Sequence, residues 1–218
     1  MNNRLLQRIS RIPKHSVLLF GIILFIFVFP LIDKGFTSQI FITISYSIML
    51  LSVASIIEQK TKWLVKLIII AIVAQWIAFF IDNNNFPILD FIAFVFSMTT
   101  FIITTFIMIQ QIVLSRRVDA KLILESIIGY LLIGVVFTLV NVLITIFNPN
   151  AIGFTNTSAH IGEIIYYSFV TVTTIGYGDI SPISQLARSA AVLFGLIGQL
   201  YLTIIVAFII GKYLNSKN

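Results

Sequence analysis

Cysteine is absent from the 218 residues, so the chain has no disulfide, no thiolate nucleophile and no cysteine metal ligand. Charge is also scarce, because Asp, Glu, Lys and Arg together make up 10% of the residues and there are 2 histidines. Such a shortage of titratable groups argues against a polar catalytic cleft. We therefore expect neither an enzyme nor a bound cofactor.

Apolar residues dominate instead. They make up 59% of the chain, including 20 phenylalanines, and the mean hydropathy is +1.06. In water this composition would leave too much apolar surface exposed, so the solvent must be largely lipid. The net charge of +6 does not indicate a nucleic-acid partner, because the basic residues lie beside apolar segments and form no stripe with aromatics.

Long apolar runs predict an all-α integral membrane protein. A helix needs roughly 20 apolar residues to cross a bilayer. Six stretches meet this requirement approximately: Ser16–Ile32, Thr37–Ile57, Trp63–Ile81, Ile88–Leu114, Leu122–Phe147 and Gln185–Gly211. The first is slightly short, but no small-residue cleavage site follows it, so we interpret it as a retained helix.

The basic residues predict the orientation. If the amino terminus is cytoplasmic, that side of the membrane collects all of the 14 Lys and Arg residues except Lys34 and Arg188. This bias places both termini in the cytoplasm of a multi-pass cell-membrane protein. Residues 1–15 are then a cytoplasmic or interfacial segment, either an amphipathic helix lying on the membrane surface or a frayed basic tail.

The segment between the last two predicted helices is unusual. Asn148–Ala159 is polar, as an exposed turret would be, and His160–Thr173 is half apolar but too short to span the bilayer. We expect the latter to be a re-entrant helix. The chain must then return through Thr174–Asp179 as non-helical backbone at membrane depth, which is costly unless its carbonyl oxygens bind something.

The residue types of this return segment suit a dehydrated cation. Gly176 and Gly178 can take positive φ, which turns successive carbonyls toward one axis. Thr174 offers both a carbonyl and a hydroxyl, and the side chains of Ile175 and Tyr177 would point away from the axis. The carboxyl end of the re-entrant helix would add partial negative charge beneath the segment.

Thr174-Ile-Gly-Tyr-Gly-Asp179 resembles the signature of potassium-selective pore-loop channels. The resemblance covers Leu122–Gly211 in the order outer helix, pore helix, filter and inner helix. It implies that K+ is bound by Thr174, Ile175, Gly176, Tyr177 and Gly178. It also implies that Asp179 lies at the filter mouth, that Tyr166, Tyr167 and Thr173 support the filter, and that Gly198 or Gly195 acts as a gating hinge. Tyr166 and Tyr167 stand where the family often has tryptophans, and Ile175 where it has valine.

One copy of this signature cannot surround an ion. Coordination from all sides needs four strands, and the chain has no second Gly-Tyr-Gly, so we expect a homotetramer in membrane lipid. The open alternatives are a non-selective cation channel of the same architecture and a transporter or accessory membrane subunit.

The four helices before the pore share the plan of voltage-gated channels but lack the gating charge. The fourth, Ile88–Leu114, contains no Lys or Arg, so steep voltage dependence has no energy source. The expected organisation is the following: 1–15 the amino-terminal segment, 16–114 a four-helix peripheral domain, 115–121 a cytoplasmic linker, 122–211 the pore domain and 212–218 a short cytoplasmic tail. We expect no regulatory domain after the last helix.

Overall fold

The computed structural model describes residues 14–28, 36–56, 62–81, 87–115, 120–154 and 161–215. The predicted interfacial segment therefore lies almost entirely outside the described residues. The chain divides into two compact units, Met1–Val28 with Ile32–Thr100 and Phe29–Leu31 with Phe101–Asn218. The boundary between the units falls inside a helix, between Thr100 and Phe101.

The first unit is built from helices α2 (Lys14–Ile23), α3 (Phe36–Ile56) and α4 (Lys62–Ile81), and from the first half of α5 (Pro87–Leu114). A single π-helical turn, η1 (Leu24–Val28), continues α2. Leu18, Ile22 and Phe25 recur at helical spacing on α2 and η1, and all three are buried.

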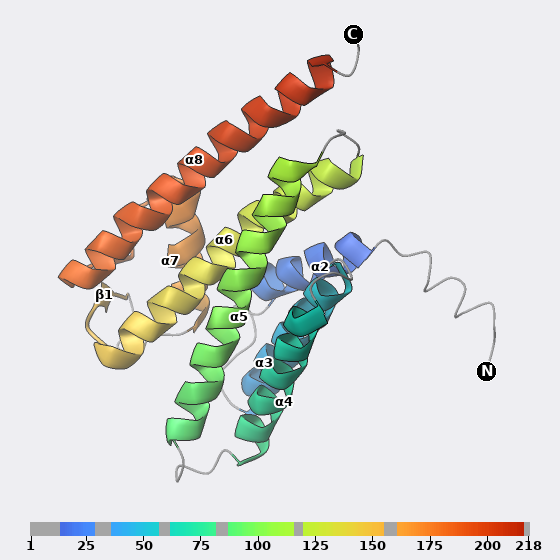
Figure 1. The fold of residues 1–218 in the computed structure, drawn as a ribbon. Helices are drawn as coiled ribbons and strands as arrows, with labels where there is room; N and C mark the ends of the chain where they lie inside the picture. Colours follow the sequence, from blue (N-terminus) through green and yellow to red (C-terminus); the bar gives the residue numbers. More distant parts are fainter. Residues whose placement is uncertain are drawn as a thin grey trace, which may run out of the picture. The chain divides into compact units, whose positions relative to one another are not determined.

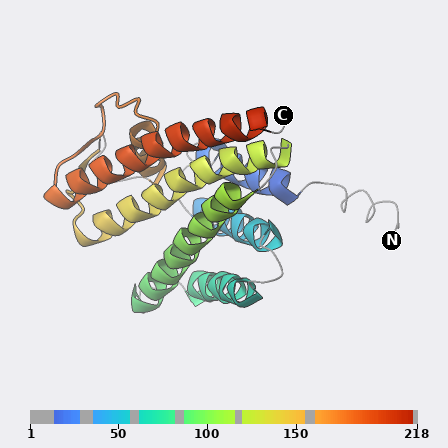
Figure 2. The ribbon, with the colours of Figure 1, turned by 45° about the horizontal axis from the view of Figure 1, so that its top comes forward.

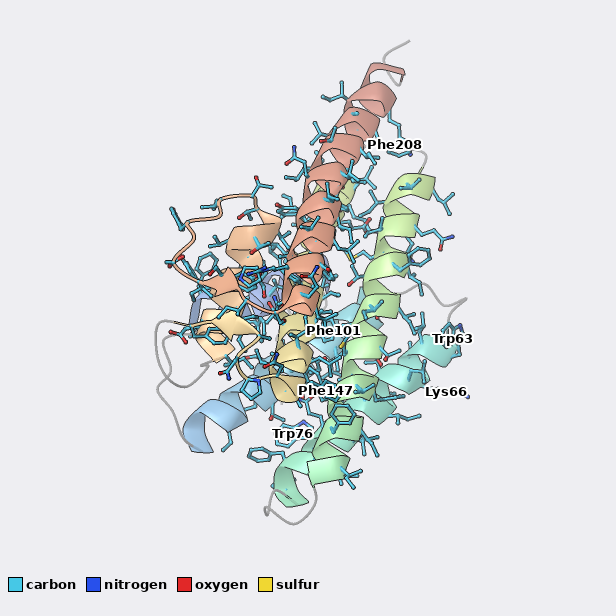
Figure 3. All side chains as sticks on the ribbon, turned by 90° about the vertical axis from the view of Figure 1, so that its left-hand side faces the viewer. Trp63, Lys66, Trp76, Phe101, Phe147 and Phe208 are labelled. Carbon is cyan, nitrogen blue, oxygen red and sulfur yellow. The ribbon has the colours of Figure 1, made fainter. Side chains whose placement is uncertain are left out.

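Helix α3 packs against both α2 and α4. The indole Nε1 of Trp76 on α4 donates a hydrogen bond of 3.0 Å to Ser47 Oγ on α3. Figure 3 shows Trp76 toward one end of α4, with Trp63 and Lys66 toward the other. Trp63 and Lys66 are exposed, as amphipathic residues near a membrane surface would be.

The second unit holds the rest of α5 and three further helices. They are α6 (Ala120–Phe147), the short α7 (Ile161–Val172) and α8 (Gln185–Asn215). Helix α7 packs against both long helices, and α6 and α8 run side by side (Figures 1 and 2). Pro87 stands at the first position of α5, where a missing N–H costs nothing, and Pro149 follows the end of α6.

A small antiparallel sheet closes the second unit on the side of the predicted turret. Strand β1 (Ile152–Gly153) pairs with β2 (Ser181–Pro182), with Ile152 opposite Pro182 and Gly153 opposite Ser181. Ala151 and Ile152 are buried, so the predicted exposed turret is exposed at 148–150 but not at its next two residues. The difference has two causes. The side chains of Ala151 and Ile152 are apolar, and their main-chain groups need the partners that the β2 segment provides.

Four of the predicted membrane spans correspond to helices that are long and apolar enough to cross a membrane: Trp63–Phe80, Phe91–Leu114, Lys121–Phe147 and Gln185–Lys212. The protein is therefore a mostly helical membrane protein. Ser16–Val28 and Thr43–Ser52 are shorter apolar helices among the residues searched, so spanning by the first two predicted segments stays a prediction.

Candidate functional site

The segment Thr174–Asp179 follows α7 directly and is non-helical, and every one of its residues is exposed in the isolated chain. Helix α7 ends at Val172, close to the predicted end of the re-entrant helix. The exposed residues include two large side chains, because Tyr177 is 72% exposed and Ile175 is 54% exposed. Water or another chain must meet this surface.

The backbone of this segment alternates in sign. Thr174, Gly176 and Gly178 have φ angles of 62°, 54° and 82°, whereas Ile175 and Tyr177 do not have positive φ. In a strand, successive carbonyls point to opposite sides. Residues of positive φ that alternate with residues of negative φ can instead turn successive carbonyls toward one side. The prediction that Gly176 and Gly178 adopt positive φ is confirmed.

The sequence does not predict positive φ at Thr174. Positive φ costs a residue with a Cβ about 1–2 kcal/mol, and such strain is found mainly at functional sites. Residue type gave no signal for it, because threonine is among the residues least expected there.

Within the isolated chain, the two glycines are required by the backbone and not by crowding. A Cβ added at Gly176 or Gly178 would have no heavy atom within 4 Å. Substitution by an L-residue would therefore disturb only the φ angles that set the direction of the carbonyls.

The last carbonyls of α7 are all bound within the second unit. The Gly176 N–H donates to Val170 O (3.2 Å), and the Thr174 N–H donates to Thr171 O (3.0 Å). The phenol of Tyr130 on α6 donates to Val172 O at 3.2 Å. A helix normally leaves these groups without partners. Here they fasten Thr174–Asp179 to α7, and α7 to α6.

Thr173 contributes to the same end of α7. Its Oγ1 donates to the carbonyl oxygens of Phe169 (2.7 Å) and Val170 (3.3 Å). The structure thus places this residue beneath Thr174, where it closes the last turn of the helix.

Tyr166 supports the outer end of the segment. Its phenol donates a hydrogen bond of 2.8 Å to Asp179 Oδ2. This hydrogen bond, and after it desolvation, raise the pKa of Tyr166, so the phenol stays protonated and continues to donate. Tyr167 lies on the other face of α7, is buried, and packs against Phe137 of α6 with ring centroids 6.0 Å apart. The two tyrosines therefore face different surroundings.

Gly198 allows α8 to approach the carboxyl end of α7. A Cβ at this position would overlap the carbonyl oxygen of Val172 and lie 2.9 Å from Val172 Cγ1. At Gly195 the nearest such atom is Thr171 O, at 4.0 Å. Helix α8 is continuous through both glycines. The structure gives Gly198 a packing role, and the gating hinge stays a prediction.

Buried polar and aromatic contacts hold the three helices together. Asn141 Nδ2 on α6 donates to Ser168 Oγ on α7 at 2.9 Å, as expected for a polar residue that links membrane helices. The phenol of Tyr201 on α8 donates to Ser126 O on α6 at 2.8 Å. Phe137 and Phe194 stack with ring centroids 4.5 Å apart. These contacts fix α7 between α6 and α8.

The outer side of the segment is fastened by main-chain bonds. The N–H groups of Ile183 and Ser184 both donate to Ala151 O, at 2.8 and 3.0 Å. Ser184 Oγ in turn accepts the N–H of Ala187 and caps α8. Arg188 Nε donates to Pro182 O at 3.3 Å. The Thr174–Asp179 segment is therefore anchored at both ends.

In the part of the chain that the structure describes, no three His, Asp or Glu residues form a group that could hold a metal ion.

Comparison with known proteins agrees with the resemblance in the sequence. Residues 125–215 match a protein-family model described as an ion channel. The matched range contains α7, α8, the Thr174–Asp179 segment and nearly all of α6. The predicted relation to pore-loop cation channels is confirmed for this part of the chain. No curated protein and no solved structure gives a significant match.

Proposed function

We propose that this chain, which carries an ion channel domain of the pore-loop cation channel family over residues 125–215, is one subunit of a potassium-selective channel. The channel conducts K+ passively across the cell membrane. Thr174, Ile175, Gly176, Tyr177 and Gly178 form its selectivity filter, and their carbonyl oxygens replace the water that the ion sheds.

One observation carries this proposal: the alternating φ of Thr174, Gly176 and Gly178. A loop that only connects two helices has no need for carbonyls turned to one side, nor for a strained threonine. A cation is the ligand that such a row of carbonyl oxygens suits. Negative charge on Asp179 at the mouth, and the carboxyl end of α7 below, favour the same ligand.

The exposure of α8 supports a homotetramer. In the isolated chain 67% of the residues in the α6 span Lys121–Phe147 are buried, but only 17% of the residues in the α8 span Gln185–Lys212 are buried. The span Gln185–Lys212 of α8 is nevertheless apolar on average, with a hydropathy of 2.4, so lipid or further copies of the chain must cover it. Four copies around one axis would cover α8 and also surround the ion with filter carbonyls.

We further propose six membrane crossings, with both termini in the cytoplasm. The excess of Lys and Arg on that side supports this orientation. With this topology α7 enters the membrane from outside as the pore helix, and the Thr174–Asp179 segment opens to the extracellular side.

Potassium flux from liposomes that hold the purified protein tests the proposal. The expected result is K+ flux that does not need valinomycin and that barium blocks. The variant Gly178→Ala, in which the pore is altered at one residue, serves as a control. If flux is absent across a range of lipids, voltages and pH, the channel proposal is wrong. Equal permeation of Na+ and K+ would instead indicate a non-selective cation channel.

A further inference from the structure

Lys212, close to the carboxyl end of α8, reaches a helix far from it in sequence. Its ammonium group donates hydrogen bonds to the carbonyl oxygens of Ser115 and of Val113, the latter at 3.3 Å. The same ammonium lies 3.8 Å from the centroid of the Phe208 ring, one turn earlier on α8. Hydrogen bonds and a cation–π contact thus hold one side chain in place.

The acceptors belong to the carboxyl end of α5. This helix ends at Leu114, so the carbonyls around it lie at the negative end of the helix dipole and beyond the reach of the regular hydrogen-bond ladder. A lysine from another helix is well suited to this position, because it brings three donors and a positive charge. The contact therefore matches a positively charged donor with carbonyl acceptors at the negative end of α5.

The end of α5 also lies close to α6 of the pore domain. A Cβ added at Gly129 of α6 would lie 3.5 Å from Ile112 Cδ1 of α5 and 2.5 Å from the hydroxyl of Tyr201 of α8. Ile112 is fully buried. Displacement of α5 would therefore be felt at two places, at Gly129 and at Lys212.

Beyond Tyr201, helix α8 has little to hold it within its own subunit. Between residues 202 and 211 only Ile205 is buried, whereas Leu202, Ile204, Val206 and Ile210 are exposed. The contact of Lys212 lies at the far end of this weakly packed stretch. A weakly packed helix with one polar restraint at its end is the kind of element that can occupy two positions.

We propose that Lys212 is a positioning residue that latches the cytoplasmic end of α8 to the carboxyl end of α5 and so favours the conducting pore. The inference rests on the proposed function, in which four α8 helices line the axis. The proposal places α5 outside the ring of α8 helices, so a bond to α5 draws the end of α8 away from the axis and widens the cytoplasmic mouth. The latch also gives the preceding helices a route by which they influence conduction without gating charge.

Single-channel recording of wild type, Lys212→Gln and Lys212→Arg tests the latch. Lys212→Gln is expected to lower the open probability about fivefold or more, with single-channel conductance and K+/Na+ selectivity unchanged. Lys212→Arg, which keeps the charge and the donors, is expected to stay near wild type. Lys121→Gln is the matched control, because it removes the same charge from an exposed side chain of α6 that forms an ion pair with Glu125 at 3.6 Å.

The outcomes separate the latch from the proposed function. If wild type conducts and Lys212→Gln leaves the open probability unchanged or raises it, the latch is wrong while the channel stands. If Lys121→Gln has the same effect as Lys212→Gln, general surface charge explains the result and the latch is again wrong. Absence of K+ current in wild type would contradict the proposed function itself.

A cross-link tests the same contact in the opposite direction. Because the chain contains no cysteine, Ser115→Cys with Lys212→Cys introduces the only two thiols. A short bifunctional methanethiosulfonate that joins them is expected to raise the open probability above that of the unlinked double variant, and reduction is expected to reverse the change. A cross-linked channel with lowered open probability would overturn the proposal, even if Lys212→Gln folded poorly.

Discussion

Tyr166 and Asp179 are joined by a hydrogen bond of 2.8 Å from the phenol to the carboxylate, although 13 positions separate them in the chain. Tyr166 lies on α7 and Asp179 lies at the outer end of the Thr174–Asp179 segment. The bond therefore links the helix that supports the proposed filter to the filter's mouth. At the other end of the segment, the N–H groups of Thr174 and Gly176 are held by carbonyls of α7.

Removal of the Tyr166 hydroxyl is expected to destabilise the conducting filter. In Tyr166→Phe the ring remains but Asp179 loses its donor, so the outer end of the filter is less restrained. Single-channel bursts should become shorter while conductance within a burst stays the same. Tyr130→Phe is a useful comparison, because it removes a hydroxyl that donates to Val172 O at the carboxyl end of α7. Bursts of wild-type length in Tyr166→Phe would contradict a supporting role.

The same bond predicts a response to alkaline pH. The Asp179 hydrogen bond and then desolvation raise the pKa of Tyr166, and only the neutral phenol donates. The stabilising effect is therefore present below the ordinary tyrosine pKa of about 10 and is lost as pH rises through the raised value. Burst length should be constant from neutral pH to about 10 and should fall above it. In Tyr166→Phe this alkaline fall should be absent, and its persistence would assign it to another group.

Gly198→Ala is expected to disrupt the packing of α7 on α8. The added methyl would overlap the Val172 carbonyl, and such overpacking typically costs about 1–3 kcal/mol. Gly195→Ala is the matched control, since its methyl meets nothing closer than 4.0 Å and alanine favours a helix. The thermal stability of the purified assembly should fall in the first variant and not in the second. If both variants are equally stable, the packing role of Gly198 is wrong, and backbone flexibility is left as the explanation for a glycine at this position.

Gly178 tests whether backbone conformation alone sets selectivity. L-alanine at this position has open space but an unfavourable φ, which costs about 1–2 kcal/mol. K+ selectivity over Na+ should be lost in Gly178→Ala. D-alanine, introduced by semisynthesis, adds the same methyl and accepts positive φ, so selectivity should be retained. If both enantiomers behave alike in reversal-potential measurements, the φ argument fails.

Asn141 and Ser168 should be coupled in stability. Their hydrogen bond is fully buried between α6 and α7, and bonds of this kind in membrane proteins are worth about 0.6–1.7 kcal/mol. A double-mutant cycle of Asn141→Leu and Ser168→Ala, followed by thermal dissociation of the assembly, should give a coupling energy in that range. Thr203→Val removes an exposed hydroxyl bonded within its own helix and should change stability by less than about 0.5 kcal/mol. A zero coupling energy would show that the two side chains do not interact in the membrane.

Much of the fold follows from the sequence, because membrane helices depend on local properties. Hydropathy and length predicted the helices that became α4, α5, α6 and α8, and the shortness of His160–Thr173 predicted α7. Residue type predicted positive φ at Gly176 and Gly178, since only glycine takes it without cost. Nothing local predicted it at Thr174, where hydrogen bonds to the end of α7 impose the conformation.

Contacts between distant residues could not be predicted. Lys212 and Val113 are separated by 99 positions, and Tyr201 and Ser126 by 75. Each pair depends on the rotation and offset of two packed helices, which the apolar pattern of a membrane helix leaves undefined. For the same reason the sequence suggests only the family's gating hinge at Gly198. The close approach of Val172 to Gly198 depends on how α7 and α8 pack.

A density map of the purified assembly in K+ tests the central claim most directly. The account predicts four subunits around one axis, with main-chain oxygens of Thr174–Gly178 facing that axis and K+ density between them. A number of subunits other than four, or side chains of Ile175 and Tyr177 facing the axis, would contradict it.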